Sequence, residues 1–257
     1  MANPAGGTGA FVTYDAATGV RPIIYGQAAN VAAVVSGNNV RLSGASTLNA
    51  GTSTVNSLTL GSNLSFTNAS DLLNLESGGL LTGGASTIGA SANSGRLTAG
   101  GASATSGTTE FFIHGLAATT INSSIVDNPA GAKVALVLGL NGQTITLSGS
   151  NTYSGPTYVN TAVAVLSSTA GGYAVPGDLI VTAGPSASGD NLGNVAGVRW
   201  AASNQMDPTK SLTVRGAALI NLNGFNQSLA GLTFINDSQG STNIPAHVTT
   251  SLSLIHI

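Results

Sequence analysis

The chain has 257 residues, of which only 6% are charged, and its formal net charge at pH 7 is −2. Soluble domains average about 25% charged residues, so this composition excludes a helical bundle with a Glu- and Lys-rich surface. It also excludes a nucleic-acid footprint, which requires clustered cations. Apolar residues make up 42% of the chain, and Gly, Ser, Thr and Asn replace the missing charge. These residues favour strands and turns, so we predict an ordered all-β chain.

The cationic residues are few and widely spaced along the chain. The cations occur singly, at Arg21, Arg41, Arg96, Lys133, Arg199, Lys210 and Arg215. No apolar run approaches the ~20 residues that a membrane helix requires. There are no cysteines. This absence fits a chain that simply uses none, and it also fits a chain that crosses an oxidising compartment unfolded.

Short strand-like runs recur from one end of the chain to the other, and Gly, Ser, Asn or Pro closes most of them. Several alternate apolar and Ser/Thr positions, which predicts strands with one buried face. In chain order the predicted strands are Val31–Val35, Asn39–Leu42, Ser57–Leu60, Leu64–Thr67, Leu72–Leu75, Glu110–His114, Lys133–Leu138, Thr144–Leu147, Val163–Leu166, Leu179–Thr182, Gly197–Ala201, Leu212–Arg215, Ala218–Leu222 and Leu232–Ile235.

Many short strands fit either a sandwich or a β-solenoid. A sandwich usually occupies about 100 residues, and no linker or composition shift divides this chain. Degenerate self-similarity favours the solenoid: residues 78–84 resemble residues 95–101, and residues 178–184 resemble residues 211–216. We expect coils of about 20–25 residues, on the order of ten of them, in a rod about 50 Å long.

The most regular unit is Leu147-Ser-Gly-Ser-Asn-Thr-Tyr-Ser-Gly-Pro-Thr-Tyr-Val-Asn160. This string resembles the autotransporter-associated β-strand repeat, and Ala217–Leu229 and Val175–Val181 resemble further units of the same family. The resemblance covers roughly residues 20–250. It implies a right-handed parallel β-helix that is secreted or displayed on the bacterial cell surface, as an adhesin-like passenger region without catalysis. It also implies an outer-membrane translocator or anchor outside these residues, and an extracellular ligand that is a glycan or a protein.

We divide the chain into an N-terminal lead-in at residues 1–19, a β-solenoid repeat region at residues 20–251 and a final segment at residues 252–257. The final segment, Leu252-Ser-Leu-Ile-His-Ile257, resembles an in-frame translation of a sequencing-library adapter. We interpret it as a scar; the alternative is a genuine last strand. Without a C-terminal cap, the last coil would present an open strand edge, and we expect self-association through it.

Parallel β-helices also host polysaccharide lyases and hydrolases, so an enzyme is the main alternative, and an inert spacer is a third. Glycoside hydrolysis requires two carboxylates held close together. The acids are Asp15, Asp71, Glu76, Glu110, Asp127, Asp178, Asp190, Asp207 and Asp237, and none forms a local cluster. Adjacent coils would be needed to bring Asp190 near Asp207 or Asp237. Single aspartates that cap turns are the simpler interpretation.

No metal or cofactor motif is present. The histidines, His114, His247 and His256, lack metal-ligand spacing, and we interpret His114 as a structural residue. Trp200 is either an interior residue, which we favour, or a sugar-stacking platform. We therefore predict no catalytic, cofactor-binding or metal-binding residue.

Overall fold

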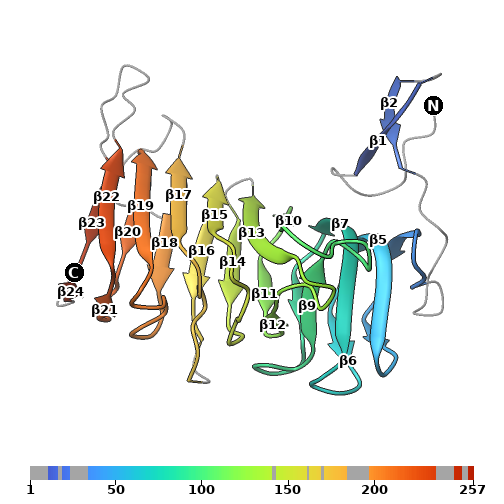
Figure 1. Cartoon of the computed structure of the whole chain (residues 1–257), viewed down its shortest axis with the longest axis horizontal. Helices are drawn as coiled ribbons and strands as arrows, with labels where there is room; N and C mark the ends of the chain where they lie inside the picture. The colour runs from blue at the N-terminus through green and yellow to red at the C-terminus, as the bar shows by residue number, and fades with distance from the viewer. Residues whose placement is uncertain are drawn as a thin grey trace.

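The computed structural model describes residues 11–16, 19–23, 34–140, 143–160, 162–168, 171–183, 197–235, 246–250 and 254–257, and within these ranges the chain consists of strands and turns without a helix (Figure 1). The all-β prediction is therefore confirmed for this part of the chain. None of the described residues belongs to a helix long and apolar enough to cross a membrane.

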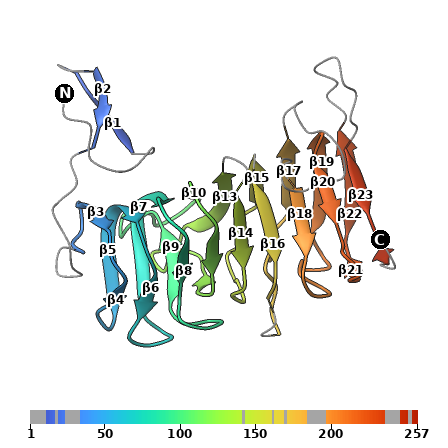
Figure 2. The ribbon, with the colours of Figure 1, turned by 180° about the vertical axis from the view of Figure 1, so that it is seen from behind.

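Two long parallel sheets form the body of the molecule. Nine rungs of the first sheet are β3 (Asn39–Leu42), β5 (Thr52–Leu60), β7 (Leu72–Thr82), β10 (Thr108–Gly115), β13 (Lys133–Leu140), β15 (Thr157–Asn160), β17 (Leu179–Ala183), β19 (Ser211–Gly216) and β22 (Gly231–Ile235). The second sheet has nine strands, β4 (Ser46–Leu48), β6 (Leu64–Phe66), β8 (Ser86–Ile88), β11 (Thr119–Ile121), β14 (Thr144–Leu147), β16 (Val163–Leu166), β18 (Gly197–Trp200), β20 (Leu219–Asn221) and β23 (His247–Thr249). The chain passes from one sheet to the other and returns one rung further along, so it forms a stack of coils (Figures 1 and 2).

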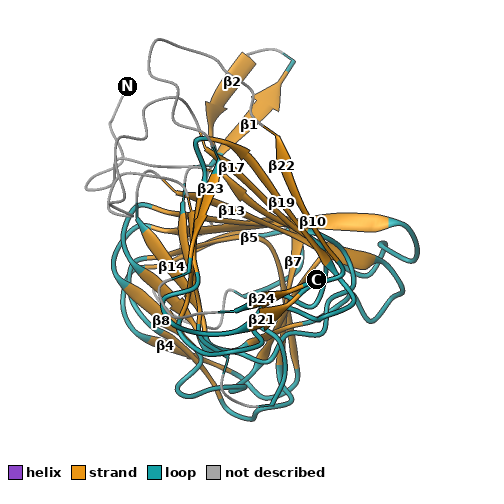
Figure 3. Cartoon of the chain, turned by 90° about the vertical axis from the view of Figure 1, so that its left-hand side faces the viewer, coloured by secondary structure: helices purple, strands orange, loops and turns teal. Residues whose placement is uncertain are grey.

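Short strands form a third side along parts of the stack. The first halves of β5 and β7 pair with each other, and β7 then pairs with β9 (Arg96–Ala99), which pairs with β12 (Ser124–Ile125). At the other end of the stack, β21 (Gln227–Ser228) pairs in parallel with β24 (Ile255–His256). Figure 3, which looks along the stack, shows the strands arranged around one central axis.

The coils vary in length more than we expected. Successive register partners in the first sheet, from Val40 through Leu58, Leu80, Ile113, Leu138, Val159, Val181 and Val214 to Phe234, lie 18, 22, 33, 25, 21, 22, 33 and 20 residues apart. The predicted coil of about 20–25 residues is therefore right for most coils, and two coils of 33 residues exceed it. Nine rungs at the usual strand spacing span about 40 Å.

The apolar core runs the whole length of the stack. One column of the first sheet is buried from β3 to β19 and consists of Val40, Leu58, Leu80, Ile113, Leu138, Val159, Val181 and Val214. Its next member, Phe234 on β22, is 45% exposed. A column of the second sheet consists of Ile88, Ile121, Leu147, Leu166 and Trp200. Side chains alternate along each short strand, so these residues face inward, and the register places each apolar side chain over an apolar side chain of the adjacent coil.

The repeat-like unit at residues 147–160 forms one corner of the stack. Gly155 lies directly over the coil below, so a Cβ atom at this position would overlap the Val134 carbonyl oxygen. One coil further on, a Cβ on Gly177 would overlap the carbonyl oxygen of Gly155. Only glycine permits this approach between backbones, which explains the spacing of glycines in the unit.

Some predicted boundaries differ from the structure. An antiparallel hairpin of β1 (Val12–Asp15) and β2 (Gly19–Pro22) crosses the expected boundary at residue 20, and the first parallel rung begins at Asn39. The predicted strand Val31–Val35 lies partly outside the described residues, and Val34 and Val35 are not in a strand. Ile255 and His256 pair with β21, but backbone pairing is independent of the origin of a sequence. The scar at residues 252–257 therefore stays a prediction.

The glycine corner can be tested by substitution. We expect Gly155→Ala to lower the stability of the fold by about 1–3 kcal/mol, because backbone atoms of the adjacent coil would have to move. Gly44→Ala is the matched control, since a Cβ there meets nothing within 4 Å. Thermal unfolding measured by circular dichroism would compare the variants, and equal melting temperatures would contradict the close-approach argument.

Candidate functional site

Buried amide side chains connect adjacent coils at the corners. The Ile125 amide donates to Asn151 Oδ1 (2.7 Å), while Asn151 Nδ2 donates to the Ala174 carbonyl (2.7 Å). Asn151 thus links the coil before it to the coil after it. An uncharged side chain with both a donor and an acceptor can do this inside the protein without the cost of burying a charge.

Further along the stack, the buried side-chain amide of Gln227 links its coil to the coil before it and also orients Trp200. Its Oε1 accepts hydrogen bonds from Trp200 Nε1 and the Met206 amide, both at 3.0 Å. Trp200 is 0% exposed. The interior interpretation of Trp200 is confirmed, and the sugar-stacking alternative is wrong because no ligand can reach a fully buried ring.

Tyr153 of the repeat-like unit is also interior. Its hydroxyl lies 2.5 Å from Thr157 Oγ1, and both side chains are buried. Burial raises the pKa of the Tyr153 hydroxyl well above its ordinary value, so the group stays protonated and is available as a donor. The Tyr and Thr of the unit therefore form a closed polar pair within the core.

Asp71 is a buried carboxylate that accepts hydrogen bonds from backbone amides. Its oxygens accept hydrogen bonds from the amides of Gly51 (2.8 Å) and Asn68 (2.6 Å), and the side chain is only 3% exposed. The Gly51 bond, followed by the bonds from Asn68, holds the pKa of Asp71 below its ordinary value. Asp71 thus joins the turn after β6 to the start of the strand in the coil before it.

Other carboxylates also accept backbone amides. Asp127 accepts from the amides of Val134 (2.7 Å) and Ser154 (2.9 Å). Asp178 accepts from the Ser211 amide (2.9 Å). Asp207 accepts from the amide and hydroxyl of Thr209, which lowers its pKa. The turn-capping interpretation is confirmed for Asp71 and Asp207, which bond residues three and two positions away, whereas the bonds from Ser154 and Ser211 connect coils.

The remaining acids do not form a described catalytic pair. Glu76 accepts from the Gly37 amide (2.7 Å), and Glu110 is exposed on β10. Asp190 and Asp237 lie outside the described residues, so the approach of Asp190 to Asp207 or Asp237 stays an alternative. The side chain of Asp15, in β1, is likewise outside the description.

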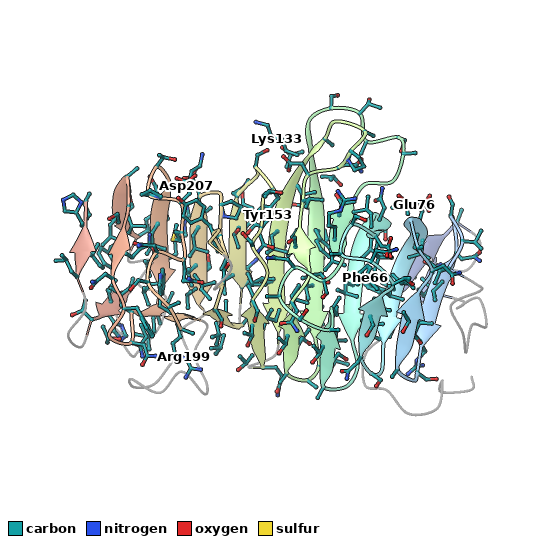
Figure 4. The ribbon with its side chains drawn as sticks, turned by 90° about the horizontal axis from the view of Figure 1, so that it is seen from below. Phe66, Glu76, Lys133, Tyr153, Arg199 and Asp207 are labelled. Carbon is teal, nitrogen blue, oxygen red and sulfur yellow. The ribbon has the colours of Figure 1, made fainter. Side chains whose placement is uncertain are left out.

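The histidines are dispersed along the stack. His114 is exposed on the outer face of β10, its ring beside the position that a Cβ of Gly139 would take, so it is not an interior residue. His247 lies in β23 and His256 in β24. Among the described residues, no group of three or more His, Cys, Asp or Glu side chains could hold a metal ion. Cations lie outside: Figure 4 shows Lys133 and Arg199 at opposite margins of the stack.

The outer face of the second sheet carries a threonine row. Thr87, Thr120 and Thr146 occupy the same register position on β8, β11 and β14, and each is half-buried. Their hydroxyls lie outward because the residues on either side of each face the core. Such rows of small polar residues stack without the repulsion that like charges would produce.

The outer face of the first sheet differs, because apolar side chains line up along it. Phe112, Val137, Tyr158 and Ile180 occupy one register position on β10, β13, β15 and β17, and we call this row the apolar stripe. Phe112 is 41% exposed, and the other three residues are half-buried. Sequence reasoning missed the stripe because its members are far apart in the chain; only the register brings them together.

Comparison of the chain with protein-family models, with curated proteins and with solved structures finds no match. The sequence resemblance described above therefore depends on the strings at residues 147–160, 175–181 and 217–229 alone.

The capping role of Asp71 predicts a pH dependence. Because its pKa is depressed in the fold, ionised Asp71 stabilises the fold above about pH 4, and this stabilisation disappears as the pH falls through the depressed pKa. We expect Asp71→Asn to lower the melting temperature at pH 7, and the gap from wild type to shrink at lower pH. Glu110→Gln, at an exposed carboxyl, is the control. A gap that stays constant down to pH 2 would contradict the capping role.

Proposed function

We propose that the chain is a passenger-type repeat region of a bacterial autotransporter or large secreted repeat protein. In this proposal it is an exported, adhesin-like rod at the cell surface that has no catalytic activity and needs no cofactor. Its coils form a right-handed parallel β-helix. An outer-membrane translocator or anchor lies outside these residues. The resemblance of residues 147–160 to autotransporter-associated repeats motivates the export route.

One observation carries the structural part of the proposal: the polar groups of the described residues hold coils together. Carboxylates at Asp71, Glu76, Asp127, Asp178 and Asp207 accept backbone amides, and buried amides at Asn151 and Gln227 link coils. At Asp71 and Asp207 these bonds lower the pKa, so each carboxylate is a poor general acid. This use of the carboxylates favours a structural rod over the alternative of a β-helical lyase or hydrolase, and the inert spacer stays the second alternative.

The first test concerns export and catalysis. We expect genomic sequence upstream of this coding region to encode an export signal and sequence downstream to encode a translocator or surface anchor. We also expect the purified chain to release no reducing ends or unsaturated sugars from polysaccharides, with heat-denatured chain as the blank. Flanks without an export signal would contradict the proposed location. Release of sugar products would favour the enzyme.

A second test concerns self-association at the C-terminal rung. Among the described strands β22 pairs only with β19, and Phe234, in register with the interior Val214, is 45% exposed. We therefore expect this 257-residue chain to form oligomers at high concentration, and Phe234→Lys to weaken them. Multi-angle light scattering at several concentrations measures this. A wild-type chain that stays monomeric throughout would show that the edge does not pair.

A further inference from the structure

The apolar stripe has a regular spacing along the rod. Register pairs Phe112 with Val137, Val137 with Tyr158, and Tyr158 with Ile180, so each side chain is one strand from the next. Adjacent strands lie about 4.8 Å apart, so the two aromatic residues, Phe112 and Tyr158, are separated by about 10 Å along the axis. Their rings thus lie on one face of the sheet, two strands apart.

The stripe is narrow, and five of the eight residues that border it are polar. On the side that follows it along the chain are His114, Gly139, Asn160 and Thr182. On the side that precedes it are Glu110, Ala135, Pro156 and Asp178, of which the last two lie just before β15 and β17. Exposed polar groups therefore lie within about 7 Å of the apolar row, two residues away along a strand. A stable protein interface has a wider apolar core surrounded by a polar rim.

The same face already packs against an aromatic ring. At the rung before Phe112, the row contains Gly79, and the ring of Phe11 lies 3.0 Å from the position a Cβ would take there. Phe11 thus fills the gap that Gly79 leaves in the row. Leu81, in the adjacent outward row, is buried. Beyond β7 the row continues as the apolar stripe, where Phe112 has substantial exposed surface.

From this geometry we propose that the apolar stripe binds an extended, uncharged polysaccharide that lies along the rod axis. The C–H faces of pyranose rings are apolar and pack on aromatic rings, while their hydroxyls hydrogen-bond to polar groups at the ring edges. The separation of Phe112 and Tyr158, two strand spacings or about 10 Å, corresponds to one disaccharide of an extended β-1,4-linked glycan.

Charge and shape both favour this ligand. The stripe contains no cationic side chain, so it does not attract a polyanion such as nucleic acid electrostatically. A glycan chain is about one ring wide, which suits a one-residue row better than a protein surface does. His114, Asn160 and Thr182 provide hydrogen-bonding groups along one side of such a chain, and Glu110 and Asp178 along the other. This inference rests on the adhesive part of the proposed function and gives its ligand a chemical class.

The experiment measures retention of the purified full chain on insoluble cellulose and chitin, and its migration in native gels that contain soluble β-1,4-xylan. We expect wild type to bind at least one of these polymers. Phe112→Ala combined with Tyr158→Ala should weaken binding about tenfold, because both stacking faces are lost. Phe112→Tyr combined with Tyr158→Phe should retain binding, since both rings remain.

Thr120→Ala combined with Thr146→Ala is the control on the opposite sheet and should bind as wild type does. Circular dichroism checks that each variant keeps the wild-type fold. Wild type that binds none of the polymers, or an alanine pair that folds and binds as wild type does, overturns the inference. The genomic flanks test the proposed export independently, so the failure of one proposal is distinguishable from the failure of the other.

Discussion

The constraint on which this structure depends is the backbone hydrogen bonding between parallel strands in register. Each rung lies about 4.8 Å from the next, so every side chain sits over its register partner for the length of the stack. A column of like charges would repel at this distance, whereas columns of Val, Leu and Ile pack and columns of Thr and Ser tolerate stacking. The low charge of the chain, 6%, follows from this geometry.

The same constraint explains the corners. Backbones of adjacent coils approach closely where the chain turns, so Gly155 and Gly177 leave no room for a Cβ. Buried amides such as Asn151 then satisfy backbone groups that the turns leave without a strand partner, and buried carboxylates such as Asp71 do the same. These side chains are committed to the scaffold, so the outer faces of the sheets remain as the surfaces that can recognise a ligand.

Sequence patterns predicted some elements closely and missed others for a physical reason. Asn39–Leu42, Thr144–Leu147 and Val163–Leu166 were predicted with the bounds they have, because alternation or a run of β-branched residues marks them. Ser46–Leu48, Ser86–Ile88 and Thr119–Ile121 were missed, since three residues rich in Ser and Thr resemble a turn. The coils of 33 residues were also not anticipated, because the residues added between their rungs leave no periodic signal.

The sequence by itself determined the all-β class, because strand and turn preferences act locally, and it indicated the degenerate repeat. The carboxylates of Asp71, Asp127 and Asp178 accept amides from residues 20, 27 and 33 positions away, so only the tertiary structure shows that they link coils. Only the tertiary structure decided that Trp200 is interior, that His114 is exposed, and that Phe112 and Tyr158 share one row. Those facts depend on register between coils of unequal length. Coils of 18 to 33 residues keep the same inward columns, so chain position alone cannot reveal that alignment, whereas a one-residue slip within a strand would turn its outward side chains inward.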